Sequence, residues 1–272
     1  MIKPIVAGQF YPAGKEALIK LLDKCFSSAK DAKKAGSKAF GIIAPHAGYA
    51  YSGNAAAVSY NAIRGAKTFV ILAPDHNGLC FSPTTTKEDF ETPLGIVRTD
   101  TELVEKLKAK CSFLKTGRIQ EHAVEVQLPF LQYLFKEFRI VPIVIPSSEY
   151  YKELGKAIAS LGKDSIIICS SDFTHYGASY GFMPFDEKNA KAGMNKLDSG
   201  AIKFIERLDA GGFLKYVQET GATICGEYAI ATAIEAVKAM EAKKGVLLNY
   251  YTSGDISEDY SLAVGYASVA FV

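Results

Sequence analysis

Three of the four histidines in this chain come shortly after runs of apolar residues. Short apolar runs bounded by turn residues are typical of strands buried in a sheet, so a histidine at their end lies at the mouth of the sheet. Neutral imidazole is the commonest protein metal ligand and the commonest general base near neutral pH. The placement therefore predicts a site where imidazoles bind a metal ion or transfer protons. The three are His46 after residues 41–44, His76 after residues 69–74 and His175 after residues 166–171.

A parallel sheet is the element that would bring these histidines together. The alanine-rich residues 54–64 form a predicted helix between the first two apolar runs. A strand–helix–strand unit favours parallel strands joined by a right-handed crossover. Ligands of open parallel sheets bind outside the carboxyl ends of the strands. We therefore expect an α/β fold with a central, mostly parallel or mixed sheet flanked by helices.

Acidic residues accompany two of these histidines. Asp75 directly precedes His76, and Asp172 lies just before His175. Each carboxylate is placed to accept a hydrogen bond from an imidazole and so fix its orientation, as carboxylates beside metal-ligating histidines do. Asp172 fits a helix cap equally well, and a pair of His175 with Asp172 also allows a metal-free hydrolase. His122, the fourth histidine, has no strand before it, and taken by itself it indicates a structural role.

The five cysteines are odd in number, widely spaced and contain no CxxC pair. This pattern argues against a disulfide framework or a zinc ribbon and indicates a reducing compartment. Cys225 stands between Ile224 and Gly226, just ahead of a predicted helix over residues 227–242. The position suits a small buried residue, and it also suits a thiolate at a helix N-terminus.

The composition is that of an ordinary globular protein. The 272 residues are 49% hydrophobic and 22% charged, which is enough for one large α/β domain over residues 1–272. A net charge of +2 gives no electrostatic reason to expect nucleic-acid or membrane-surface binding. No signal pattern opens the chain, and no apolar run approaches the ~20 residues of a membrane helix. We therefore expect a cytoplasmic protein.

Common nucleotide-binding and hydrolase motifs are missing. The sequence has no GxGxxG after a strand, no GxxxxGK[ST], no HExxH and no GxSxG. No nucleotide cofactor is expected. Apolar periodicity predicts the remaining elements, with Pro129 dividing a helix and Pro142 marking an edge strand or a bulge. These are helices at residues 15–35, 99–110, 122–135, 150–161, 187–208 and 212–220, strands at 93–98, 140–145, 246–251 and 262–272, and a long loop at 77–92.

Six segments, spread over nearly the whole chain, resemble the MEMO family. Each segment alone is weak evidence, but together and in this order they are specific. The prokaryotic members of this family are known as protein B of the AmmeMemoRadiSam system. The segments are GQFYP at residues 8–12, APHAGYAYSG at 44–53, PDH at 74–76, EHAVEVQLP at 121–129, SSDFTHYG at 170–177 and TICG at 223–226.

The resemblance implies a fold related to the class III extradiol (LigB-type) dioxygenases, which are non-haem Fe(II) enzymes. It implies that His46 and His76 are metal ligands and that Cys225 stands where those enzymes keep a carboxylate ligand. It implies that His175, beside Asp172, matches their acid/base histidine. Two histidines and a carboxylate form the facial triad of non-haem iron oxygenases, whereas a thiolate is softer and suits copper or zinc as well as Fe(II).

The expected function is therefore that of a metal-binding protein with a dioxygenase-like pocket, a metal-dependent oxidoreductase that uses Fe(II) or Cu. The main alternative is a non-catalytic module that recognises a peptide or a modified side chain, because animal members are described as phosphotyrosine-peptide-binding adaptors. The resemblance also implies partner proteins from the AmmeMemoRadiSam system. A small molecule or peptide would contact aromatic walls at Phe10, Tyr49 and Tyr51, together with His122.

Overall fold

The computed structural model describes residues 1–30, 39–63, 65–146, 149–162 and 164–272. These residues form a central sheet with helices packed on both of its faces. The strands are β1 (Gly41–Ala44), β2 (Thr68–Pro74), β3 (Thr84–Thr85), β4 (Phe90–Thr92), β5 (Gly95–Thr99), β6 (Lys115–Thr116), β7 (Arg139–Ile145), β8 (Ser165–Ser170), β9 (His175–Gly177), β10 (Gly245–Thr252) and β11 (Leu262–Phe271). The α-helices are α1 (Lys15–Ser28), α2 (Tyr49–Tyr60), α3 (Thr101–Lys110), α4 (His122–Glu125), α5 (Leu128–Leu134), α6 (Tyr151–Ala159), α7 (Glu187–Glu206), α8 (Ala210–Thr220), α9 (Glu227–Ala239) and α10 (Ser253–Ser257).

The main path of the sheet runs β10–β11–β1–β8–β2–β7–β3–β6. The central strands β1, β8, β2 and β7 are parallel to one another, so their carboxyl ends meet at one edge. β11 is antiparallel to both β1 and β10. The sheet is therefore mixed with a parallel centre, and the predicted fold class is confirmed.

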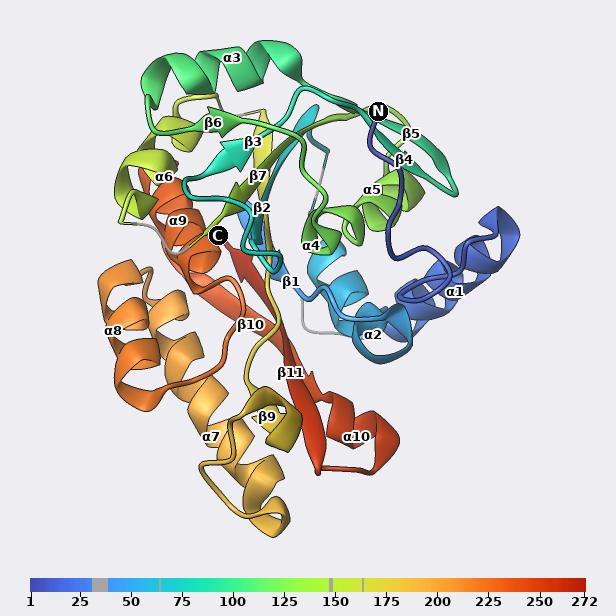
Figure 1. Ribbon diagram of the computed structural model, residues 1–272, viewed down its shortest axis with the longest axis vertical. Helices are drawn as coiled ribbons and strands as arrows, with labels where there is room; N and C mark the ends of the chain where they lie inside the picture. The colour runs from blue at the N-terminus through green and yellow to red at the C-terminus, as the bar shows by residue number, and fades with distance from the viewer. Residues whose placement is uncertain (31–38, 64, 147–148, 163) are drawn as a thin grey trace.

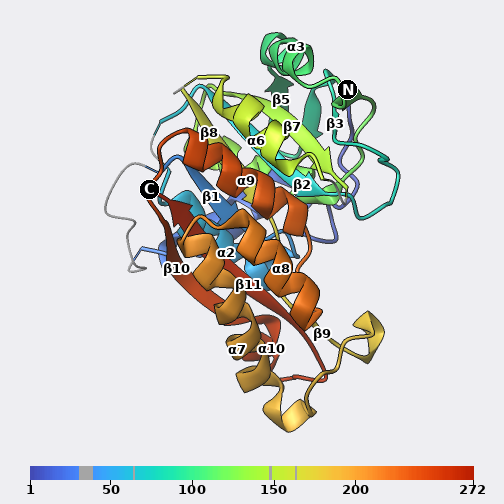
Figure 2. The same cartoon turned by 90° about the vertical axis from the view of Figure 1, so that its left-hand side faces the viewer.

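The central strands are apolar throughout because both faces of the sheet are covered. Successive side chains of a strand point to opposite faces. Ile43 and Ile167 accordingly pack with α6, α8 and α9, while Ile42 and Ile168 pack with α1, α2 and α5. Figure 1 shows these two helical layers on either side of the sheet, and Figure 2 shows α6, α8 and α9 in front of it.

Two details of the strand predictions are corrected. β1 and β2 are parallel, but they are not neighbours, because β8 lies between them. The connection through α2 therefore passes over β8. β7 is an interior strand, although Pro142 suggested an edge or a bulge. On the side away from β2, β7 pairs with β5 at Arg139–Ile140 and with β3 at Ile143–Val144. Pro142 falls between these two short pairings, where its missing N–H is tolerated.

Other element predictions differ at their ends. α2 begins at Tyr49, whereas the sequence placed its start near Asn54. The helix predicted over residues 15–35 is observed as α1, and residues 31–38 lie outside the described residues. The loop predicted at 77–92 contains the short strands β3 and β4. In the part of the chain that the structure describes, no helix is long and apolar enough to cross a membrane.

Candidate metal centre

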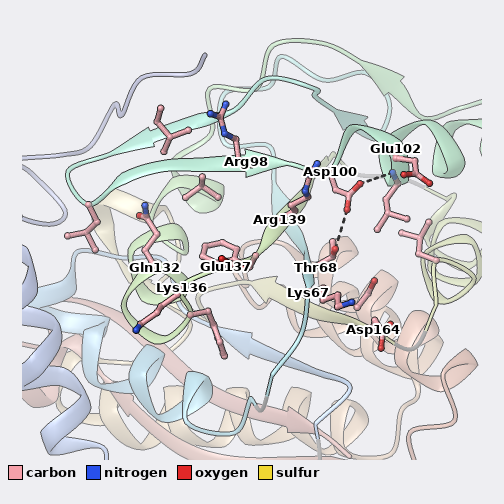
Figure 3. Close-up of a pocket in the computed structure, with 18 residues that line it drawn as sticks. Lys67, Thr68, Arg98, Asp100, Glu102, Gln132, Lys136, Glu137, Arg139 and Asp164 are labelled. Atoms are coloured by element: carbon pink, nitrogen blue, oxygen red, sulfur yellow. Dashed lines mark hydrogen bonds between the residues drawn. The ribbon is translucent and has the colours of Figure 1, made fainter.

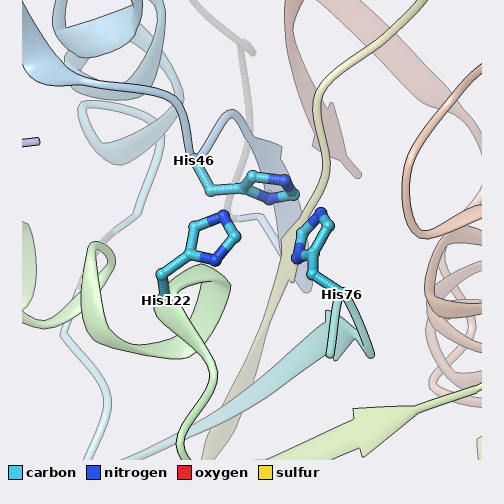
Figure 4. A group of neighbouring side chains, drawn as sticks. All are labelled: His46, His76 and His122. Carbon is cyan, nitrogen blue, oxygen red and sulfur yellow. The ribbon is translucent and has the colours of Figure 1, made fainter. Parts of the chain in front are cut away.

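Three imidazoles converge at the carboxyl edge of the parallel strands. His46 follows β1, His76 follows β2, and His122 begins α4. Their ring centroids are 5.0 Å apart for His46 and His76, 5.5 Å for His46 and His122, and 4.4 Å for His76 and His122. One ring nitrogen from each lies within 4.8 Å of the others. Figure 4 shows the three rings meeting from three separate segments of the chain.

His122 is the member of this cluster that the sequence analysis did not assign as a metal ligand. No apolar strand precedes it, so by itself it indicated a structural role, and its one expected functional place was a ligand-binding wall. One feature of the sequence could have indicated a functional His122. Glu121 directly precedes it, as Asp75 directly precedes His76. Without the fold, nothing in the sequence distinguishes these two acids.

Glu121 holds two of the three imidazoles. One of its carboxylate oxygens, Oε1, lies 2.8 Å from Nδ1 of His76 and 3.1 Å from Nδ1 of His122. Its other oxygen accepts the backbone N–H of His76 at 2.9 Å. The carboxylate expected to orient His76 was Asp75, but Asp75 instead accepts the backbone N–H of Cys80. Glu121 therefore has the orienting role.

The electrostatic state of the cluster follows from burial and these hydrogen bonds. Burial acts to raise the pKa of Glu121, but the bonds from His122 and His76 outweigh it, and the pKa falls well below its usual range. Burial lowers the pKa of His46, and the neighbouring His76 and His122 rings lower it further. At neutral pH the site therefore contains an ionised Glu121 and a neutral His46, which is the form that binds metals.

His46 also belongs to a second group of ligating atoms, with Asp172 and Cys225. Its Nε2 lies 3.1 Å from Cys225 Sγ and 4.0 Å from Asp172 Oδ2. Burial raises the pKa of the Cys225 thiol well above its usual value, and the nearby Asp172 raises it further. Burial likewise raises the pKa of Asp172. Without a metal, Cys225 is therefore a thiol, and its Sγ lies within hydrogen-bond distance of both His46 Nε2 and the Asp172 carbonyl oxygen, the latter at 3.8 Å.

The local backbone places Cys225 against the strand ends. Gly226, the N-cap of α9, has φ +79°. A side chain there would begin 3.3 Å from both Pro74 Cδ and the Ser170 carbonyl oxygen, and its conformation would be strained. Ser171 donates its hydroxyl to the Cys225 carbonyl. Cys225 is thus at the predicted helix N-terminus and beside the predicted ligand His46.

His175 and Asp172 are close to the cluster but have separate partners. Nδ1 of His175 lies 3.0 Å from the Thr223 carbonyl oxygen, and its ring packs edge-on against Tyr180. Asp172 Oδ1 accepts the backbone N–H of His46 at 2.7 Å. These bonds do not form the His–Asp pair that a metal-free hydrolase would need.

A cavity of about 510 Å³ opens onto this cluster. All four histidines of the chain line it, together with Asp172, Phe10 and Tyr51. The lining also includes Tyr180, Tyr266 and side chains from the C-terminal region, namely Ser253, Ser257, Asp259, Leu262 and Val264. Tyr49 was expected here, but it is 3% exposed, and its hydroxyl donates to the Val126 carbonyl at 2.6 Å. The early start of α2 turns Tyr49 into the core.

A larger hollow, of about 920 Å³, lies at the opposite edge of the sheet. Figure 3 shows its lining, which includes four basic and four acidic residues. Asp100 there caps α3 and accepts from Thr68, and Arg98 pairs with Asp89. These partners are structural, and neither of the ligand groups found in the described residues lies there. Size alone therefore does not identify the functional site.

The donor set at the histidine cluster fits a transition-metal ion. Three imidazole nitrogens, with a sulfur and a carboxylate next to His46, are ligands that Fe, Cu and Zn accept. Atoms that each lie ~2 Å from one ion are no more than ~4 Å apart, and nitrogens within 4.8 Å of one another come close to this spacing. Glu121 supplies the carboxylate behind the imidazoles that such sites use.

Comparison with known proteins extends over the whole chain. A family model described as "Memo-like protein" matches residues 3–270. A MEMO1 family protein of Methanopyrus kandleri is 39% identical over 98% of each chain. One of Nitrosopumilus maritimus is 36% identical over 99% of each chain. A crystal structure of an uncharacterized protein from Escherichia coli K12 has a TM-score of 0.51 at 12% identity, covering 78% of this chain and 89% of that one, which indicates a shared fold.

Proposed function

This chain belongs to the family of Memo-like proteins, and on that premise we propose that it binds one transition-metal ion at His46, His76 and His122. Fe(II) and Cu are the leading candidates, and Zn is the third. Cys225, beside His46, is the adjacent sulfur donor. When bound, such an ion supplies Lewis-acid or redox chemistry to a ligand in the cavity.

One observation carries this proposal. Three imidazoles from distant segments meet, and a single carboxylate that is 4% exposed orients two of them. Burying a charge among imidazoles lowers the stability of a fold. Such clusters are therefore found mainly at functional sites. The two histidines differ in exposure. His46 is 2% exposed, whereas the side chain of His76 is 30% exposed and lies at the open end of the cluster. A ligand that enters the cavity therefore reaches His76 first.

His175 is the residue proposed to move protons beside the metal site. The Thr223 carbonyl only accepts hydrogen bonds, so Nδ1 of His175 carries the hydrogen and Nε2 remains a proton acceptor. Asp172, buried nearby, lines the same cavity. Together they would accept and return a proton at one wall of the cavity.

The cavity favours a small aromatic ligand that is neutral or positively charged. Its volume lies within the range of small-molecule sites. Phe10, Tyr51, Tyr180 and Tyr266 provide aromatic walls. Among its described lining residues, Asp172 and Asp259 are acidic and none is Lys or Arg. An anionic ligand would depend on the metal alone for a counter-charge.

Metal analysis of the purified chain tests the site. We expect about one Fe, Cu or Zn ion per chain after anaerobic purification. His76→Ala should lower the content several-fold, because the ion loses a ligand. His175→Ala is the matched control, since it removes a cavity imidazole outside the cluster and should retain the metal. Full loading of a variant that lacks His46, His76 and His122 would refute the site.

Oxygen uptake separates an enzyme from a binding module. An iron-loaded oxidoreductase should consume oxygen with at least one member of a panel of catechols and phenols, and His175→Ala should slow this consumption by ~100-fold or more. Binding without any uptake across the panel would identify a module that uses the same cavity without turnover.

A further inference from the structure

We propose that the segment Glu121–Gln127 determines which ring nitrogen of His46, His76 and His122 is free to bind a metal ion. An imidazole binds a metal through the nitrogen that carries no hydrogen, and the bond at its other nitrogen decides which one that is. The inference rests on the proposed metal site. It makes Glu121 and Gln127 positioning residues rather than ligands.

Glu121 fixes two of the three rings. Its Oε1 lies within hydrogen-bond distance of Nδ1 in both His76 and His122. Both oxygens of Glu121 also accept backbone N–H groups, from Ala123 and His76, so the carboxylate acts as an acceptor throughout and Nδ1 of each ring carries the hydrogen. Nε2 is then the nitrogen that each neutral ring offers to a metal.

Ser170 fixes the third ring. Its hydroxyl has one hydrogen, which it donates to the Ala123 carbonyl at 2.7 Å. Nδ1 of His46 lies 3.0 Å from the same hydroxyl oxygen. Because the serine hydrogen is already used, Nδ1 of His46 is the donor in this contact. Nε2, which faces Cys225 Sγ, is therefore the free nitrogen.

Gln127 holds Ser170 in this arrangement. Its amide nitrogen donates to Ser170 Oγ at 2.8 Å and to the Pro45 carbonyl at 3.0 Å. The Pro45 carbonyl only accepts, and the Tyr60 hydroxyl donates to Gln127 Oε1 at 2.9 Å, so the amide has one orientation. Gln127, Ser170 and Tyr60 are all 0% exposed. No water competes for these bonds.

The opposite arrangement breaks a buried bond. If Ser170 donated to His46, the Ala123 carbonyl would lose its hydroxyl partner and Nε2 of His46 would carry the hydrogen. The Cys225 thiol would then have only the Asp172 carbonyl, 3.8 Å from Sγ, to which it could donate. Buried polar groups are nearly always hydrogen-bonded, which favours the first arrangement.

Nuclear magnetic resonance of the full-length, metal-free chain tests the assignment directly. With four histidines, ¹⁵N-histidine labelling gives few enough ring signals to assign by single His substitutions. Long-range ¹H–¹⁵N spectra distinguish the two neutral tautomers. We expect the Nδ1–H form at His46, His76 and His122. An Nε2–H form at any of the three would overturn the proposal.

Two substitutions and a control extend the test. Ser170→Ala should remove the single tautomer of His46. Glu121→Gln should end the fixed tautomers of His76 and His122, because the amide must place its NH₂ group against either the two Nδ1 atoms or the His76 backbone N–H. Both should weaken Zn(II) binding by ~10- to 100-fold. Ser59→Ala removes a buried hydroxyl that donates to the Ile43 carbonyl, and it should change neither property.

Unchanged tautomers in Ser170→Ala and Glu121→Gln would refute the inference. If either variant does not fold, the wild-type spectrum still decides the assignment. The spectra are recorded without metal, so a failure to bind Zn(II) with the expected tautomers present would count against the proposed metal site alone.

Discussion

His46 Nε2 and Cys225 Sγ lie 3.1 Å apart although 179 residues separate them in the chain. This contact joins the two groups of ligating atoms, because His46 belongs to both. The sulfur is therefore next to the three-histidine cluster through one shared ring. The contributions of His122 and Cys225 to metal affinity can therefore be compared by single substitutions.

We expect His122→Ala to weaken metal binding more than Cys225→Ala does. His122 is within the 4.8 Å cluster with His46 and His76, whereas Cys225 is grouped with His46 and Asp172. The expected loss is ~10-fold or more for His122→Ala. Competition titrations with a chromophoric chelator measure both affinities. A larger loss in Cys225→Ala would instead favour the His46, His76 and Cys225 ligand set implied by the family resemblance.

Metal removal should lower the stability of the fold. An ion that binds only the native state contributes about 2.7 kcal/mol to the free energy of unfolding when its free concentration is 100 times Kd. Urea titrations with Zn(II) and with a chelator measure the difference. The triple variant His46→Ala/His76→Ala/His122→Ala is the control and should show no such gain. Equal stabilisation of that variant would place the ion elsewhere.

Ligand charge should decide affinity in the cavity. We expect metal-loaded protein to bind tyramine at least as tightly as p-cresol, and both more tightly than 4-hydroxyphenylacetate. The reason is that Asp172 and Asp259 are acidic lining residues. Asp259→Asn should weaken tyramine binding by about two- to fivefold, since this carboxylate is exposed and screened. Calorimetry measures all three ligands, and tightest binding of the acid would contradict the prediction.

Asp198 should make stability fall as pH rises. Burial raises its pKa from 3.8 to about 6, although hydrogen bonds from Thr174 and Tyr250 lower it. Its carboxyl keeps its proton in the native state after the unfolded chain has released it. The stabilising difference is present below pH 4 and is lost as pH rises through about 6. At ~1.4 kcal/mol per pKa unit, the loss is on the order of 3 kcal/mol.

Asp198→Asn therefore should become more stable relative to the wild type as pH increases from 4 to 6. Urea unfolding of the metal-free proteins at several pH values measures this. Ser59→Ala, which removes a buried group that does not titrate, is the control and should show a constant difference. A constant difference in Asp198→Asn as well would rule out the assigned pKa shift.

The N-terminal segment should depend on one buried carboxylate. Glu125, 4% exposed, accepts the backbone N–H groups of Ile5 and Val6 and the Tyr11 hydroxyl. Tyr11→Phe should cost about 1–3 kcal/mol, because a bond to a buried charge is lost. Tyr133→Phe removes a hydroxyl bond to Asp23 at the surface and should cost less than ~0.5 kcal/mol. Urea unfolding measures both losses of unfolding free energy. Equal losses in Tyr11→Phe and Tyr133→Phe would contradict the prediction that the bond to Glu125 is the more important one.

The site residues that could be predicted from the sequence are those that directly follow a parallel strand. His46 and His76 follow buried parallel strands, and parallel strands end at one edge, so their meeting could be inferred from local pattern. Cys225 required the family resemblance, since a lone cysteine before a helix is also a common core residue. The family and the fold class are both confirmed.

The remaining features depend on contacts that no local pattern records. His122 joins the cluster because Glu121 binds His76, 45 residues earlier in the chain. Asp75, although adjacent to His76, turns to Cys80 instead. Tyr49 was expected at the cavity wall, but α2 begins at this residue, five residues before the predicted start, and its side chain lies in the core.

Because Glu121 shares its carboxylate between two imidazoles, substitutions at these three residues should be coupled in evolution. A lineage that replaced His76 alone would leave Glu121 with one ring partner and a buried charge that is less well compensated. The second loss, of His122 or of Glu121 itself, would then cost less than it does in the ancestral protein. These three positions should therefore change together, as a unit under epistasis.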